Sequence, residues 1–409
     1  MNILLVTPMP PQVTEPTGAI PMLLHALLIG LLPHHTITLV TIAGPDPAEW
    51  AAVDHLREVG ITVEAVYRTE PEGRARWRRR WRFATSWLGG HYPWRTVWFA
   101  EPGVQPILDR LLNNHQFDIV HIEDNAVAVY QYRTQTPILL TEYEVRRPRA
   151  FDAHWWTRPS RTWALLNELD WQRWPSYQRA VWQRFDRVQV FTERDAASAR
   201  ELAPELAGRV RVNPFAIEIP TPLDPTREEP ATLLLVGNFT HPPNVDAALW
   251  LVHEILPLLQ RWRPDIRLEI VGNSPPQSVQ LLAASNVIVT GRVPDVRPFF
   301  ERASIVLAPI RTGGGMRMKV LQAMAMGKAV VVTPRGAEGL TMNGIEPPLA
   351  IAEDAQAFAR ATTALLVSDE ARHSLGSSAR AFVVEHFSPE AHARRLESIY
   401  CELTFGSQE

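Results

Sequence analysis

Two series of short apolar runs constrain the fold of this 409-residue chain more than any other feature. The first series starts at residues 2–7 and the second at residues 232–236, and each run is continuously apolar, as in parallel strands buried on both faces. Helical patterns separate the runs, and a strand–helix–strand order requires a right-handed crossover. The sequence therefore predicts an α/β protein with two doubly wound parallel sheets.

A proline-rich segment divides the two series. Residues 220–230 contain four prolines, a composition typical of a linker between domains. We predict an N-terminal domain over residues 1–219, a hinge over 220–230 and a C-terminal domain over 231–388. The last helical pattern, over about 389–405, is a candidate to pack back on the N-terminal domain.

The remaining apolar runs extend both series. In the first half they predict strands at residues 36–41, 61–66, 117–123, 137–142, 187–192 and 210–213. In the second half they predict strands at residues 266–271, 286–290, 305–308, 330–333 and 348–351. A short helix is predicted between 117–123 and 137–142, and one continuous helix over about 244–260. Ligands bind at the carboxyl ends of the strands in such sheets, so we expect the loops that follow the strands to form a functional cleft.

The composition excludes several classes of protein. A formal net charge of −3 at pH 7 argues against general nucleic-acid binding. The single cysteine, Cys401, excludes an internal disulfide and a cysteine-cluster metal site, and favours a reducing compartment. No apolar run approaches the length of a membrane span, and the chain enters its first predicted strand at Asn2 without the pattern of a signal peptide. We therefore expect a cytoplasmic protein.

A glycine-rich loop in the second half has the chemistry of a phosphate site. Gly313, Gly314 and Gly315 follow an apolar run and precede a helical pattern that begins near residue 316. Free backbone amides and the positive end of a helix dipole suit an anion there, and Arg317 and Lys319 add two cations in the first turn. The alternative is a tight helix–strand connection with two solvated basic residues, the commoner interpretation of a lone glycine-rich loop.

Five segments of the second half occur in a recognisable order at predicted strand ends. They are residues 235–238 with 242–247, 269–273, 289–295, the glycine loop with its helix at 313–328, and 336–340. Together they resemble the group 1 (family 4) glycosyltransferases, which have the GT-B fold of two Rossmann-like domains facing across a cleft. The resemblance is looser in the first half, where it covers residues 3–10 with Gly18, 118–123 and 192–195.

This resemblance implies transfer of a sugar, with retention, from a nucleotide-diphosphate sugar to a glycan, lipid-linked or small-molecule acceptor, with no metal and no further cofactor. Loss of a nucleoside diphosphate requires preorganised positive groups at the leaving phosphate. The implied catalytic residues are Arg317, Lys319 and Tyr143. The implied donor-binding residues are Gly237, Asn238, Gly313, Gly314, Gly315, Gln322 and Glu338.

Three of these positions depart from the family's pattern. Gly314 and Gln322 stand where the family commonly has two glutamates, and Tyr143 stands where many members have a histidine. Backbone amides would replace the first side chain, a neutral amide the second, and a phenol is a poor base near neutral pH. A catalytically impaired relative that binds nucleotides or glycans, or acts as a scaffold, therefore stays open. A Rossmann dehydrogenase is a third reading, but the loops after residues 7 and 236 lack G-x-G-x-x-G.

Acidic residues at predicted strand ends are the candidates for acceptor binding. Glu123 and Glu142 end two strands of the first half and, with Gly18, are expected in the cleft, where carboxylates accept sugar hydroxyls. The alternative for each glutamate is to cap a following helix. Glu338 has the same two interpretations, nucleotide contact or helix cap. His121 lies within a predicted strand and is expected to be a packed core residue.

Two clusters of aromatic residues complete the sequence features. The segment Arg74–Arg82 holds six arginines and two tryptophans, which predicts peripheral membrane contact or a site for an anionic lipid-linked acceptor. Its alternative is a solvated helix whose tryptophans pack on the core. A second group of tryptophans, between residues 155 and 182, has helical spacing and predicts a helical insertion, with stacking on an acceptor sugar open for one of them.

Overall fold

The computed structural model describes residues 1–12, 19–68, 81, 85, 89, 92–148, 161–313 and 317–406. The described chain divides into two compact units, one formed by Met1–Ala216 with His392–Glu409 and the other by Ile217–Ala391. Gly18, Gly314, Gly315 and the Arg74–Arg82 segment apart from Trp81 lie outside the described residues. Their predicted roles are therefore still predictions.

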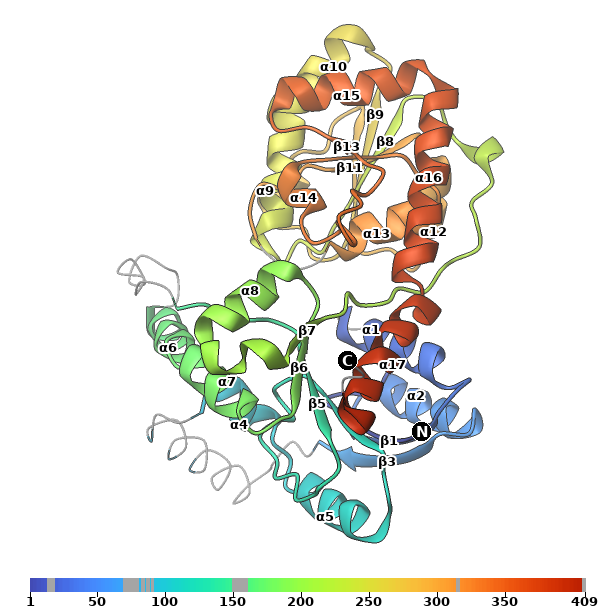
Figure 1. Ribbon diagram of the computed structural model, residues 1–409. Coiled ribbons are helices and arrows are strands. Elements are labelled where there is room, and N and C mark those ends of the chain that lie inside the picture. The colour runs from blue at the N-terminus through green and yellow to red at the C-terminus, as the bar shows by residue number, and fades with distance from the viewer. Residues whose placement is uncertain are drawn as a thin grey trace. The chain divides into compact units, whose positions relative to one another are not determined.

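The N-terminal unit is built on a seven-stranded parallel sheet in the order β3-β2-β1-β4-β5-β6-β7 (Figure 1). The sequence order reverses between β1 and β4, which makes this pair the topological switch point of the sheet. The strands are β1 Asn2–Thr7, β2 Thr36–Ala43, β3 Thr62–Tyr67, β4 Ile119–Glu123, β5 Ile138–Glu142, β6 Arg187–Val190 and β7 Val210–Val212.

Helices cover both faces of this sheet, which explains why its central strands carry apolar side chains on both faces. The helices are α1 Ala19–Leu31, α2 Pro47–Glu58, α4 Trp94–Phe99, α5 Val104–Asn114, α6 Arg161–Trp171, α7 Trp174–Trp182, α8 Glu193–Leu202 and α17 Pro389–Phe405, with a 3-10 turn at Pro204–Arg209. Because strand side chains alternate between faces, Ile3 and Leu5 pack with α1, α2 and α17, while Leu4 and Val6 pack with α5, α7 and α8.

The C-terminal unit repeats this plan with a six-stranded parallel sheet in the order β10-β9-β8-β11-β12-β13. Its switch point lies between β8 and β11. The strands are β8 Thr232–Val236, β9 Arg267–Val271, β10 Val287–Gly291, β11 Ile305–Ala308, β12 Val330–Val332 and β13 Ala350–Ile351. The helices are α9 Pro242–Trp250, α10 Leu256–Trp262, α11 Gln277–Gln280, α12 Arg297–Arg302, α13 Met318–Ala325, α14 Pro334–Ala337, α15 Ala355–Val367 and α16 Asp369–Phe387. One face packs on α9, α10 and α15 (Figure 1).

Two predicted helices differ from the structure. Residues 125–129 form turns rather than a helix, because Asp124 adopts a φ of 76° and its Oδ1 accepts from the amide of Ala126 at 2.8 Å. The predicted helix over 244–260 is interrupted by a π-helical turn at Leu251–Ile255. Pro257 explains this interruption, since proline has no N–H for the carbonyl four residues earlier.

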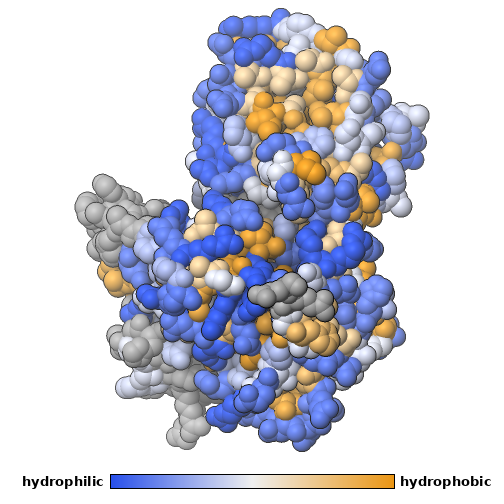
Figure 2. Space-filling model, in the orientation of Figure 1, coloured by the Kyte–Doolittle hydropathy of each residue, from blue (hydrophilic) through white to orange (hydrophobic). Residues whose placement is uncertain are grey.

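The surface shows no single dominant chemistry on the face in view. Figure 2 shows hydrophilic and hydrophobic residues intermixed over the described part of that face. Of the helices in the described residues, none combines the length and the apolar composition that crossing a bilayer requires.

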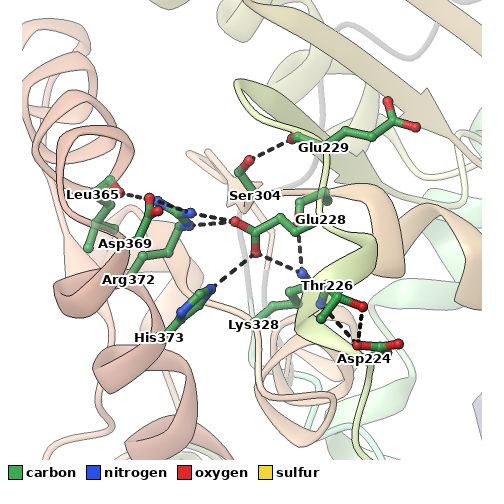
Figure 3. A network of polar contacts seen from close by, with 11 residues as sticks. Asp224, Thr226, Glu228, Glu229, Ser304, Lys328, Leu365, Asp369, Arg372 and His373 are labelled. Atoms are coloured by element: carbon green, nitrogen blue, oxygen red, sulfur yellow. Dashed lines mark hydrogen bonds and ion pairs between the residues drawn. The ribbon is translucent and has the colours of Figure 1, made fainter.

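The end of the proline-rich segment is fixed to the C-terminal unit by buried charges (Figure 3). The Glu228 side chain is 9% exposed; its Oε1 accepts from Arg372 Nε at 2.8 Å and its Oε2 from Lys328 Nζ at 3.2 Å. Lys328 also donates to the carbonyl of Ala303 at 2.6 Å, and Arg372 donates to the carbonyl of Leu365 at 2.9 Å. The carboxylate therefore neutralises two buried cations, each of which also donates to a backbone carbonyl.

Replacing Glu228 by glutamine should destabilise the C-terminal unit. The substitution leaves two buried cations without their anion, and loss of one partner of a buried pair typically costs about 3–5 kcal/mol. Glu229→Gln is the matched control, because the Glu229 side chain is 43% exposed and such surface pairs contribute less than about 1 kcal/mol. Urea unfolding measures both, and equal midpoints for the two variants would refute the role of Glu228.

Candidate functional site

The loops that follow four neighbouring strands meet at the carboxyl edge of the C-terminal sheet. The hydroxyl of Thr333, after β12, donates to the carbonyl of Ile310, after β11. The amide of Phe239, after β8, donates to the carbonyl of Asn273, after β9, at 2.9 Å. Because β8 and β11 form the switch point, this edge is where a doubly wound sheet binds its ligand.

Glycines let these loops approach one another closely. Gly272 has a φ of +152°, and a Cβ there would lie 1.6 Å from the carbonyl oxygen of Gly237. Gly313 has a φ of +86°, and a Cβ there would lie 2.8 Å from Pro243 Cγ at the start of α9. A side chain at either position would force the loops apart.

Arg317 is a buried residue of this edge. It occupies the N-cap position of α13, which starts at Met318, two residues later than the sequence predicted. The residue is 8% exposed, and its guanidinium donates to the carbonyls of Arg335 and Gly313, both at 3.1 Å. The guanidinium is thus fixed between the loops that follow β11 and β12, so the interpretation as a solvated basic residue is wrong.

Lys319 is also largely buried. Its Nζ donates to Asn244 Oδ1 in the first turn of α9. Burial, together with the charge of Arg317, lowers the pKa of the ammonium to about 8. Two close cations that are both removed from water are an arrangement that an anion would stabilise. The interpretation of Lys319 as a solvated residue is wrong as well.

The other predicted donor residues lie around these cations. Gln322 is half-buried on α13, one turn beyond Lys319. Asn238 is exposed, and its Oδ1 accepts from the amide of Thr240 at 3.1 Å, so it caps the loop after β8. Glu338 follows the end of α14 and pairs with Arg335 at 2.9 Å, while Thr333 caps the start of that helix. Glu338 therefore does not cap the start of a helix, and it is instead the C-cap residue of α14.

The N-terminal unit has a cavity of about 160 Å³ at the carboxyl ends of β4 and β5. Polar and charged residues predominate in its lining, which consists of Ile20, Asp124, Asn125, Glu142, Tyr143, Glu144, Arg146 and Trp174. The Arg146 guanidinium lies 3.9 Å above the Trp174 ring and donates to Glu144 at 3.0 and 3.1 Å. The cavity thus has an apolar ring at one wall and several carboxylates at the others.

Glu142 is the buried carboxyl of this cavity. Its Oε1 accepts from Asn125 Nδ2 at 2.7 Å and its Oε2 from Trp182 Nε1 at 3.0 Å. Burial, followed by the charge of Asp124, raises its pKa to about 7. The backbone after Glu142 is not helical over the described residues up to 148, so helix capping is wrong for this residue.

Glu123 and Tyr143 form a second polar group at the same strand ends. Glu123 is 2% exposed, and its Oε1 lies 2.9 Å from Nε2 of His121, a fully buried core residue as predicted. Burial, and then the Glu123 carboxylate to which its hydroxyl is bonded, raise the pKa of Tyr143 well above the usual value for a phenol. Turns follow Glu123, so the predicted helix cap is wrong here too.

Sequence reasoning missed Asn244, Trp174 and Arg146. Asn244 follows two prolines after β8, a pattern that predicts only the start of a helix. Trp174 was one member of the tryptophan group whose predicted helices are α6 and α7. The only sequence signal for the cavity was Glu142, which ends a predicted strand.

Comparison with solved structures defines the class of fold. HepE from Anabaena, solved with UDP and glucose, aligns with a TM-score of 0.60 and 14% identity over 97% of this chain and 98% of that one. With the two parallel sheets described above, the fold is GT-B, as the sequence predicted. Residues 230–368, all of them in the C-terminal unit, match the model described as "Glycosyl transferases group 1".

Two curated relatives each match less than half of the chain. A protein from Klebsiella pneumoniae, described as an uncharacterized 44.6 kDa protein in the cps region, is 30% identical over 137 residues. The lipopolysaccharide core biosynthesis mannosyltransferase LpcC of Rhizobium leguminosarum bv. viciae is 25% identical over 175 residues. The matches cover 31% and 41% of this chain, and 35% and 49% of those relatives.

The Glu142 carboxyl should make stability depend on pH. Its folded pKa is raised, so its stabilising contribution is complete at low pH and is lost as pH rises through 7. Between pH 5 and 8 the unfolding free energy of the wild type should fall by about 2–3 kcal/mol relative to Glu142→Gln. Glu144→Gln, a change at a largely exposed side chain, is the control. Parallel pH curves for wild type and Glu142→Gln would exclude the effect.

Proposed function

We propose that this protein is a glycosyltransferase that moves a sugar from a nucleotide-diphosphate sugar to an acceptor with retention of configuration. The observation that carries the proposal is the burial of Arg317 and Lys319 together at the switch point of the C-terminal sheet. The family match over residues 230–368 and the similarity to a mannosyltransferase support the same activity. The C-terminal unit is the donor domain and the N-terminal unit the acceptor domain.

The two cations act on the leaving group. As the bond between the anomeric carbon and the β-phosphate oxygen breaks, negative charge grows on the diphosphate, and Arg317 and Lys319 stabilise it, so no metal is required for this task. The acceptor oxygen bonds to the anomeric carbon on the same face, and its proton passes to the departing phosphate. Burial raises the pKa of Tyr143, which disfavours its phenolate, so in this proposal the departing phosphate is the base.

The acceptor site is the cavity that contains Glu142. Its buried carboxyl and the Asn125 amide are hydrogen-bonding groups for sugar hydroxyls. The relatives from a cps region and from lipopolysaccharide core biosynthesis point to a cell-surface glycan as acceptor. The protein acts in the cytoplasm, and peripheral membrane contact through Arg74–Arg82 is part of the proposal.

A binding or scaffold role is the second candidate. It is favoured by Gln322 and Tyr143, which stand at positions where the family's pattern has acidic and imidazole groups. Titration with UDP, GDP and ADP combined with a donor-hydrolysis assay separates the candidates. Nucleotide binding without release of sugar from any donor would support the second candidate, and release of sugar would exclude it.

Arg317→Ala should weaken nucleoside-diphosphate binding by about 1–3 kcal/mol, the range of a lost charge-assisted hydrogen bond. Isothermal titration with UDP measures this loss. Arg267→Ala is the matched control, since Arg267 begins β9 at the opposite edge of the sheet and pairs with the exposed Glu229. An unchanged dissociation constant in Arg317→Ala would remove Arg317 from the site.

Lys319 should make nucleotide binding depend on alkaline pH. The ammonium is the form that attracts phosphate, and in the free protein its pKa is about 8, so affinity should fall as pH rises from 7.5 to 9.5. The decline approaches about tenfold per pH unit once the free lysine is neutral. Lys319→Met should bind more weakly at pH 7.5 and lose this decline. A wild-type affinity that is constant over the range would contradict the assignment.

A further inference from the structure

The chain contains only two lysines, Lys319 and Lys328, among 41 lysines and arginines. Both belong to the C-terminal unit and both are largely buried. Lys328 is paired with the Glu228 carboxylate at 3.2 Å, whereas Lys319 donates to a neutral amide, Asn244 Oδ1. A lysine is a compact point charge on a flexible stem, so its position depends on the group that holds it.

Asn244 links the loop after β8 to helix α13. It lies in the first turn of α9, is 9% exposed, and its Nδ2 donates to the carbonyl of Asn238 at 2.6 Å. Its Oδ1 accepts from Lys319 on α13. A carbonyl oxygen can only accept and an ammonium can only donate, so these two partners fix the orientation of the amide.

An amide is the group that meets both requirements without adding charge. An aspartate would accept from Lys319 but could not donate to Asn238, and its charge would oppose an arriving phosphate. An apolar residue would leave both partners unsatisfied. The space is also narrow, because a Cβ on Gly237 would lie 3.2 Å from Asn244 Cγ.

We propose that Asn244 is a positioning residue for nucleotide-diphosphate binding, which holds the Lys319 ammonium between the loops after β8 and β11 while leaving its charge available to phosphate. This inference rests on the proposed function. Ordering a lysine side chain costs conformational entropy, and the Asn244 contact orders it before the ligand arrives. The neutral partner leaves the positive charge uncompensated by the contact itself, in contrast to the Glu228 carboxylate beside Lys328.

A double-mutant cycle with UDP as the probe tests the inference. At pH 7.5, Asn244→Ala should weaken UDP binding about tenfold, the scale of one lost charge-assisted contact. In the Lys319→Met background the same substitution should have little further effect, because a residue that acts through Lys319 loses its target. A loss below twofold in Asn244→Ala, or an equal loss in both backgrounds, overturns the proposal.

Asn286→Ala is the matched control for a lost amide contact. Asn286 Nδ2 donates to the carbonyl of Ile266 at 3.3 Å, next to the start of β10 and therefore at the opposite edge of the sheet. Its UDP affinity should equal that of the wild type. A tenfold loss in Asn286→Ala would show that any missing amide in this unit weakens binding, and would overturn the specific role of Asn244.

A ligand-free measurement covers the case in which Asn244→Ala does not fold. With ¹³C-labelled lysine, the two lysine side chains give two assignable NMR signals, and Lys319→Met identifies one of them. Asn244→Asp, which keeps the shape of the amide, should raise the pKa of Lys319 by about one unit or more through its new charge, while UDP binding weakens. A Lys319 titration that does not respond to Asn244→Asp overturns the contact.

This measurement also separates failure of the inference from failure of the proposed function. If the wild type binds no UDP, GDP or ADP, the nucleotide site is refuted, and with it the role of Asn244 in binding. The NMR titration would then still report whether Asn244 holds Lys319. If nucleotides bind but Asn244→Ala weakens UDP binding equally in the wild-type and Lys319→Met backgrounds, the transferase proposal stands and the positioning role is refuted.

Discussion

The contact between a lysine ammonium and a neutral amide is the interaction on which the C-terminal site depends. Burial, and then the charge of Arg317, lower the pKa of Lys319. The protein holds both cations with neutral groups, namely the Asn244 amide and the backbone carbonyls of Gly313 and Arg335. Neutral dipoles of this kind hold a cation without cancelling its charge, so the site keeps a positive charge that attracts an anion.

The fold was predictable from the sequence because helices cover both faces of each sheet. A strand such as Asn2–Thr7 is then apolar over its four central residues, whose side chains alternate between two hydrophobic cores. Two predicted helices differ from the structure for local reasons that hydrophobic periodicity does not include. Pro257 shifts the preceding turn of its helix to π geometry, and the positive φ of Asp124 replaces a helix by turns.

The site was only partly predictable, for a different reason. The glycines and cations of the loop after β11 are close together in the sequence, so a phosphate-binding pattern could be recognised from the sequence alone. Asn244 and Lys319 are 75 residues apart, and Glu142 and Trp182 are 40 residues apart. Only the order of strands in the sheets brings the members of each pair together. Glu123 and Glu142 were placed correctly at strand ends, but neither caps a helix. The partners of Glu142 are an amide and an indole of other segments, and those of Glu123 are His121 and Tyr143.

The attachment of the proline-rich segment changes what that segment can do. Besides the Glu228 pairs, the Ile217 amide donates to the carbonyl of Phe387 at 2.9 Å, and Arg297 donates to the carbonyls of Thr221 and Pro222 at 3.1 and 3.2 Å. A segment that is hydrogen-bonded at its beginning, middle and end has few accessible conformations, so its length adds little conformational entropy. The segment is therefore held along the C-terminal unit. A proline-rich sequence that resembles a flexible linker is here part of the folded unit that follows it.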